Sequence, residues 1–184
     1  MKRLTAALVL MSVALAGAQA KPDFSGRWTS DPDPVAAAQA GRGAGAGTAG
    51  RGGPPADVGS GWGSTITITQ AATSLAVEYA FFTRGDMQPP LKFVYALDGS
   101  ETKNSVWMGR GEQVQTSRAA WDGTRLKITT VYRFTDPSTN KPMTEDVVTV
   151  LSLESPASLI VETTRAGVLG GPASSTRTAY KKIS

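Results

Sequence analysis

The sequence contains neither cysteine nor histidine in its 184 residues. Without cysteine the chain cannot form a disulfide, so the folded domain must be stabilised by its core alone. The two absences together exclude Ser-His-Asp and Cys-His catalysis, thiolate or imidazole zinc sites, and haem held by histidine or cysteine. We therefore expect no metal site and no cofactor.

Catalytic carboxylate pairs are also lacking. Glu145 and Asp146 are adjacent, so a strand would point them to opposite faces. Asp31 and Asp33 lack the glycine and glutamate spacing of a calcium loop. The other glutamates lie in separate segments, without a shared pattern of the kind that glycosidases use. We predict that the protein is not an enzyme.

Positive charge is not clustered. The chain has 19 lysines and arginines against 15 acidic residues, and after residue 20 the only adjacent basic pair is Lys181-Lys182. Arg42 and Arg51 lie in a glycine-rich background that suggests an RNA-binding segment, but no aromatic residues accompany them. A solvated linker is the better interpretation, and we expect no nucleic-acid partner.

The N-terminus has the pattern of a signal peptide. Lys2 and Arg3 precede the apolar run Leu4–Ala16, which is short for a membrane span, and Ala18-Gln19-Ala20 matches a cleavage site. We predict a signal peptide over residues 1–20, with cleavage after Ala20. The mature protein is then secreted or periplasmic, without stable membrane insertion after cleavage. An uncleaved N-terminal anchor is the alternative.

The rest of the chain alternates polar and apolar residues with the period of a β-strand. The predicted strands are Phe24–Thr29, Thr65–Gln70, Ser74–Phe82, Leu91–Leu97, Thr102–Met108, Glu112–Trp121, Arg125–Phe134, Thr144–Leu153, Leu159–Thr164 and Ser175–Lys182. Turn signals such as Asp98-Gly99 and Asp122-Gly123 separate them, and no amphipathic helix interrupts them. This predicts an all-β fold, an antiparallel up-and-down β-barrel of about 8–10 strands, which leaves no exposed sheet edge.

Residues 21–184 form one predicted domain with a flexible insertion. The insertion, residues 35–61, is rich in glycine, alanine and proline and has almost no large apolar side chain to bury. It separates the first predicted strand from the second.

Three predicted strands have a strongly apolar face that should point into the barrel. These faces carry Tyr79, then Phe93 with Tyr95, and Tyr132. Buried tyrosine hydroxyls need partners, which favours a polar-lined cavity over a dry core. On Glu112–Trp121 both faces are similar, so Arg118 is either an inward residue that pairs with an acidic headgroup or an outward surface residue.

Three segments resemble motifs of the calycins, the superfamily of lipocalins and fatty-acid-binding proteins. Phe24–Trp28 is similar to their N-terminal F-x-G-x-W, in which Gly26 and Trp28 are the structural signature. Ala119–Leu126 resembles the W-x-G-x-x-L hairpin, and Ser175–Lys182 resembles the closing strand of the fatty-acid-binding group. The chain is also similar to small exported bacterial lipocalin-like proteins. The resemblance implies a calycin barrel with an internal ligand.

The chain departs from that group at two places. The group has a helix pair after its first strand, where this chain has the glycine-rich residues 41–61. The group's carboxylate site uses an arginine and a tyrosine two residues apart, but Arg177 and Tyr180 are three apart and lie on opposite faces of a regular strand. A β-bulge would restore the pairing.

These observations leave two functions open. The first is an exported lipocalin-like barrel that binds a small hydrophobic molecule or fatty acid. An acidic hydrophobic ligand is one form of this hypothesis. Its predicted ligand-binding residues are Arg118, Arg177, Tyr79, Tyr95, Tyr132 and Phe93. The alternative is a structural or protein-interaction barrel of the cell envelope, with a filled core and no ligand.

Overall fold

The computed structural model describes residues 20–30, 62–79, 90–108, 111–135, 139–166 and 173–183. These residues form ten strands and, within these ranges, no helix. The strands are β1 (Gly26–Ser30), β2 (Thr65–Gln70), β3 (Ser74–Tyr79), β4 (Leu91–Ala96), β5 (Glu101–Met108), β6 (Gly111–Asp122), β7 (Arg125–Thr135), β8 (Pro142–Ser155), β9 (Ser158–Arg165) and β10 (Ser174–Ile183). The predicted all-β class is confirmed. The predicted insertion at residues 35–61 lies outside the described residues.

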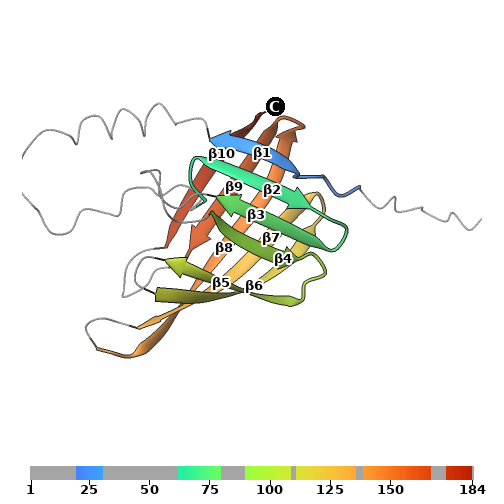
Figure 1. Cartoon of the computed structure of the whole chain (residues 1–184). Coiled ribbons are helices and arrows are strands. Elements are labelled where there is room, and N and C mark those ends of the chain that lie inside the picture. The colour runs from blue at the N-terminus through green and yellow to red at the C-terminus, as the bar shows by residue number, and fades with distance from the viewer. Residues whose placement is uncertain are drawn as a thin grey trace, which may run out of the picture.

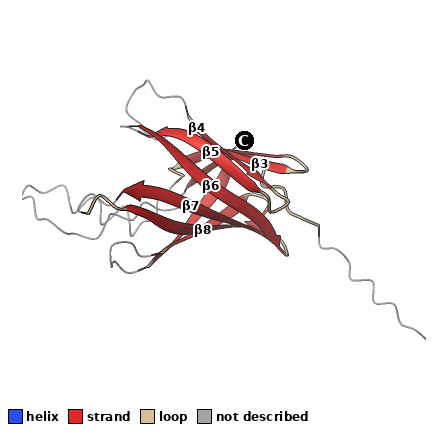
Figure 2. Ribbon diagram, turned by 90° about the horizontal axis from the view of Figure 1, so that it is seen from below, coloured by secondary structure: helices blue, strands red, loops and turns tan. Residues whose placement is uncertain are grey.

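All ten strands belong to one antiparallel sheet that curls into a nearly closed barrel (Figures 1 and 2). Strands that follow one another in the chain are paired, except β4 and β5. β1 pairs with β2 on one side and with β10 on the other, so the first and last strands lie side by side. The predicted antiparallel β-barrel is therefore confirmed.

A side chain, rather than a backbone ladder, joins the two ends of the sheet. The Val94 N–H on β4 donates to Asn104 Oδ1 on β5 at 2.7 Å, and Asn104 Nδ2 donates to the Val94 carbonyl at 3.0 Å. The amide of Asn104 therefore supplies the donor and the acceptor that a neighbouring strand would present. We call this junction the β4–β5 seam.

The two ends of the barrel differ. At one end, the closed end, short turns join β2 to β3, β4 to β5, β6 to β7 and β8 to β9. The connections from β1 to β2, β3 to β4, β5 to β6, β7 to β8 and β9 to β10 all run from the opposite end, which we call the open end. The antiparallel order of the strands requires this separation.

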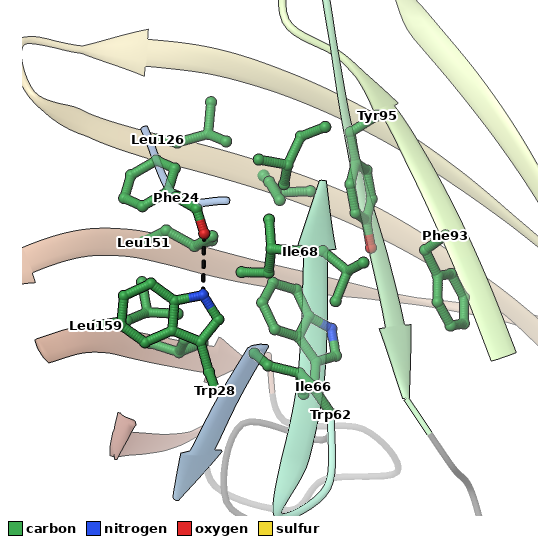
Figure 3. Packing of buried hydrophobic residues seen from close by; sticks show 14 of the residues in the cluster. Phe24, Trp28, Trp62, Ile66, Ile68, Phe93, Tyr95, Leu126, Leu151 and Leu159 are labelled. Carbon is green, nitrogen blue, oxygen red and sulfur yellow. Dashed lines mark hydrogen bonds between the residues drawn. The ribbon is translucent and has the colours of Figure 1, made fainter. Parts of the chain in front are cut away.

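Aromatic residues fill the closed end (Figure 3). Trp28 is fully buried, and its indole Nε1 donates to the Phe24 carbonyl at 2.9 Å. The Phe24 ring stacks on Trp121, with ring centroids 5.8 Å apart. Gln70 fixes the segment across the barrel, because its side chain accepts from the Phe24 N–H and donates to the Pro22 carbonyl. The N-terminal segment therefore covers the bottom of the barrel.

Gly26 lets a lysine cross this closed end. Its φ is +143°, and a Cβ at this position would lie 2.4 Å from Cε of Lys182. The Lys182 ammonium then lies 5.2 Å from the centroid of the Trp28 ring, within the range of a cation–π contact. The backbone conformation favours glycine here, and the missing Cβ leaves room for the flexible end of the exposed Lys182 side chain.

Candidate functional site

A small cavity of about 30 Å³ lies inside the barrel toward the open end. Its lining combines aromatic rings, neutral polar side chains and one cation. The lining residues are Trp62, Tyr79, Phe93, Tyr95, Gln115, Thr130, Tyr132, Val147, Thr149 and Arg165. We call this set the open-end cavity.

Strand alternation explains why four predicted residues line this cavity. On β3, Leu75, Val77 and Tyr79 are buried, and on β4 the buried residues include Phe93 and Tyr95. The apolar residues of each strand determine the face that turns inward, and the tyrosines share that face. Tyr132 on β7 lines the cavity in the same way. The structure thus brings together Tyr79, Phe93, Tyr95 and Tyr132.

Several polar groups in the cavity have no protein partner. Tyr79, Tyr95 and Gln115 are 8%, 3% and 5% exposed. Within the part of the chain that the structure describes, the Tyr79, Tyr95 and Tyr132 hydroxyls and the Gln115 amide form no hydrogen bond with protein. By contrast, the Thr130 hydroxyl bonds to its neighbour Ser117 at 2.8 Å. Buried polar groups in native proteins are normally paired, so this cluster is open to a bound molecule.

The three tyrosines act as donors at neutral pH. Burial raises the pKa of Tyr79 and of Tyr95 far above the ordinary value of 10.0, and nearby tyrosines add to the effect. Burial also raises the pKa of Tyr132, while Arg165 opposes that shift and Glu145 adds to it. The hydroxyls therefore stay protonated and can each donate one hydrogen bond.

Arg165 is the cation of the cavity, and our sequence predictions missed it. It ends β9, where Leu159, Val161 and Thr163 are buried and Glu162 is on the opposite face. Alternation from Leu159 therefore turns Arg165 inward. The signal was present in the sequence, because Glu162 marks the outer face of this strand.

The two arginines predicted as ligand-binding residues lie on the outer face instead. Arg118 is exposed and pairs with Glu101 at 3.0 Å. Arg177 is exposed and pairs with Glu154. The β6–β7 register explains the orientation of Arg118, since Ala119 lies opposite the buried Ile128 and so takes the inward face. Neither arginine lines the open-end cavity.

Arg177 lines a different feature, a shallow groove of about 350 Å³ on the outside of β7 to β10. Arg125 and Glu162, which form an ion pair at 2.9 Å, lie in the same groove. Both arginines there already have a carboxylate partner, and exposed pairs of this kind are weak. The groove therefore offers fewer unpaired polar side chains to a ligand than the open-end cavity does.

Comparisons with protein-family models, with curated proteins and with solved structures gave no match. In the described ranges, no helix is long and apolar enough to cross a membrane. The geometry of the barrel is thus the basis for assigning a function.

Proposed function

We propose that this protein is an exported, calycin-like barrel that binds a small, partly hydrophobic ligand in its open-end cavity. The observation that carries the proposal is the cluster of unpaired polar groups on Tyr79, Tyr95, Tyr132 and Gln115. These groups face the cavity, so each can form a hydrogen bond with a bound molecule. One such bond contributes about 0.5–1.5 kcal/mol net.

The rings around these groups explain the hydrophobic part of the ligand. Tyr79 and Phe93 are stacked, with centroids 5.6 Å apart and planes inclined by 10°. Trp62 lines the same cavity and is 7% exposed. Such aromatic walls with a few convergent polar groups are typical of small-molecule sites.

The size of the cavity limits how much of the ligand lies inside. One water molecule needs about 10–15 Å³ by this type of measure. The cavity of about 30 Å³ therefore holds a group of two or three heavy atoms. A larger ligand therefore places only one such group in this cavity.

The small volume of the cavity also suits the second function, a structural or protein-interaction barrel that binds no ligand. Phe24, Trp28, Leu126 and Leu151 pack in the closed half, and all four are fully buried. In such a barrel, two or three waters would bond the polar groups and no ligand would bind. The two functions differ in whether the cavity accepts an organic molecule.

Two measurements distinguish the ligand-binding barrel from the filled barrel. The first is native mass spectrometry of the purified protein. The second is calorimetric titration with hexanoate and with its neutral isostere, hexanamide. The binding function predicts a retained small molecule or saturable uptake of at least one probe. Replacing Tyr95 with phenylalanine removes only a hydroxyl and should weaken uptake about two- to tenfold, since one hydrogen bond contributes about 0.5–1.5 kcal/mol. The variant Thr67→Ala, at an exposed position on β2, is the control. A clean mass without uptake of either probe would support the filled barrel.

Export is the second part of the proposal. The basic, apolar and small-residue segments of residues 1–20 support it. The intact mass of the protein recovered from a secreting host should correspond to a chain that begins at Lys21. A mass that includes residues 1–20 would indicate the uncleaved anchor.

A further inference from the structure

We infer that the ligand carries a carboxylate and that Arg165 binds it at the open-end cavity. This inference rests on the proposed function, because it specifies the chemistry of the ligand for the same cavity. It identifies an arginine on β9 as the charge-selecting residue, in place of Arg118 and Arg177.

The charges around the cavity favour an anion. Arg165 is half-buried and lines the cavity, and no carboxylate is among the lining residues. Three arginines on the outer face, Arg118, Arg125 and Arg177, each pair with a glutamate. Among the residues that the structure describes, Arg165 has no carboxylate within ion-pair distance. A partly desolvated guanidinium without a counter-ion is a binding site for a planar oxyanion.

The neutral groups of the cavity suit the same ligand. A carboxylate accepts up to four hydrogen bonds, and two of them can come from one guanidinium. Tyr79 and Tyr132 lie near enough to Arg165 for its charge to act on their hydroxyls. The three-atom carboxylate group also matches the volume of the cavity, about 30 Å³. The headgroup therefore enters the cavity, and the apolar part of the ligand lies toward the open end.

Within the described ranges, Glu145 is the one acidic side chain that acts on the tyrosines of this cavity. It lies opposite Tyr132 in the β7–β8 register, is half-buried, and acts electrostatically on that tyrosine. It forms no ion pair with Arg165 among the described residues. Its charge opposes an incoming anion, so Glu145→Gln should tighten hexanoate binding about two- to threefold, the effect expected of a solvent-screened charge.

The test compares the affinities of hexanoate and hexanamide, two probes of nearly equal shape that differ in charge. The wild-type protein should prefer hexanoate by about tenfold or more, because hydrogen bonds to charged groups contribute about 1.5–3 kcal/mol. In Arg165→Gln this preference should fall to about unity, while hexanamide affinity stays within about twofold. Arg177→Gln removes the same charge from the outer face and should keep the preference.

The outcomes separate the inference from the function on which it rests. If neither probe binds the wild-type protein, both are overturned. If both bind with equal affinity and Arg165→Gln changes nothing, the binding function stands and the inference fails. If Arg165→Gln and Arg177→Gln lose the preference for hexanoate equally, the preference is an effect of net charge, and the inference about Arg165 is overturned.

Circular dichroism and the urea midpoint establish that each variant is folded. Arg165→Lys, which keeps the charge, should retain part of the preference for hexanoate.

Discussion

Replacing Asn104 with leucine removes the two hydrogen bonds that join β4 to β5, while keeping the number and branching of the side-chain heavy atoms. Asn104 is 7% exposed, and its amide both accepts from and donates to the main chain of Val94. No backbone ladder connects these two strands, so the substitution tests whether one side chain holds the barrel closed.

The expected cost follows from the two bonds. Their lengths, 2.7 and 3.0 Å, are those of well-formed hydrogen bonds. Each contributes about 0.5–1.5 kcal/mol net, so Asn104→Leu should lower the free energy of unfolding by about 1–3 kcal/mol. With a urea m-value of about 2 kcal/mol/M, the unfolding midpoint falls by about 0.5–1.5 M. Lys103→Ala, at an exposed position on the same strand, should change the free energy of unfolding by less than about 0.5 kcal/mol.

Hydrogen exchange gives the local measurement. The Val94 N–H points toward β5, so the N–H groups of Phe93 and Tyr95 point toward β3. In Asn104→Leu the Val94 amide should lose protection, while the amides of Phe93 and Tyr95 change only as much as global stability does. An unchanged urea midpoint together with unchanged exchange at Val94 would refute the role of Asn104 in the β4–β5 seam.

Two further predictions concern the closed end and the tyrosines. Gly26→Ala should destabilise the protein by about 1–3 kcal/mol in urea unfolding, because φ is +143° and Lys182 must move. Gly99→Ala, where φ is +84° and no atom lies within 4 Å of the added Cβ, should cost less; an equal or larger cost would contradict the packing argument. The pKa of Tyr95 is raised in the folded state, so the unfolded chain loses that proton first, near its ordinary value of 10.0. The free energy of unfolding should therefore be unaffected by Tyr95 below about pH 10 and fall above it. Absorbance at about 295 nm, which detects tyrosinate, should show delayed ionisation of the native protein; full ionisation near pH 10 without loss of stability would contradict the burial.

Strands with one clearly apolar face could be predicted from the sequence. The alternation of Leu75, Val77 and Tyr79 determines which residues are buried, since a shift of one residue would expose the whole set. The same reasoning places Phe93 and Tyr95 inside. Their part in ligand binding stays a prediction.

The orientation of β6 could not be predicted, because its two faces differ little in hydrophobicity. Gln115, Ser117 and Ala119 turn inward, although none is a large apolar residue. Pairing with β7 determines which face of β6 turns inward, since Ala119 lies opposite the buried Ile128. Arg118 is consequently outside. Only a long-range register, which no local pattern encodes, resolves such a strand.

The β4–β5 seam likewise could not be predicted from sequence patterns. An asparagine in a predicted strand gives no sign that its amide will replace a missing backbone ladder. Arg165 is different, because Leu159, Val161 and Glu162 together indicate its face. Local alternation could have found the cation of the cavity.

A map of amide chemical-shift changes during titration with hexanoate tests the central claim, ligand binding in the open-end cavity, most directly. The account predicts that saturable changes are largest at Tyr79, Phe93, Thr130 and Arg165, with little change at Gly26 in the closed end. No saturable change at all, or largest changes in the outer groove of Arg125 and Arg177, would contradict it.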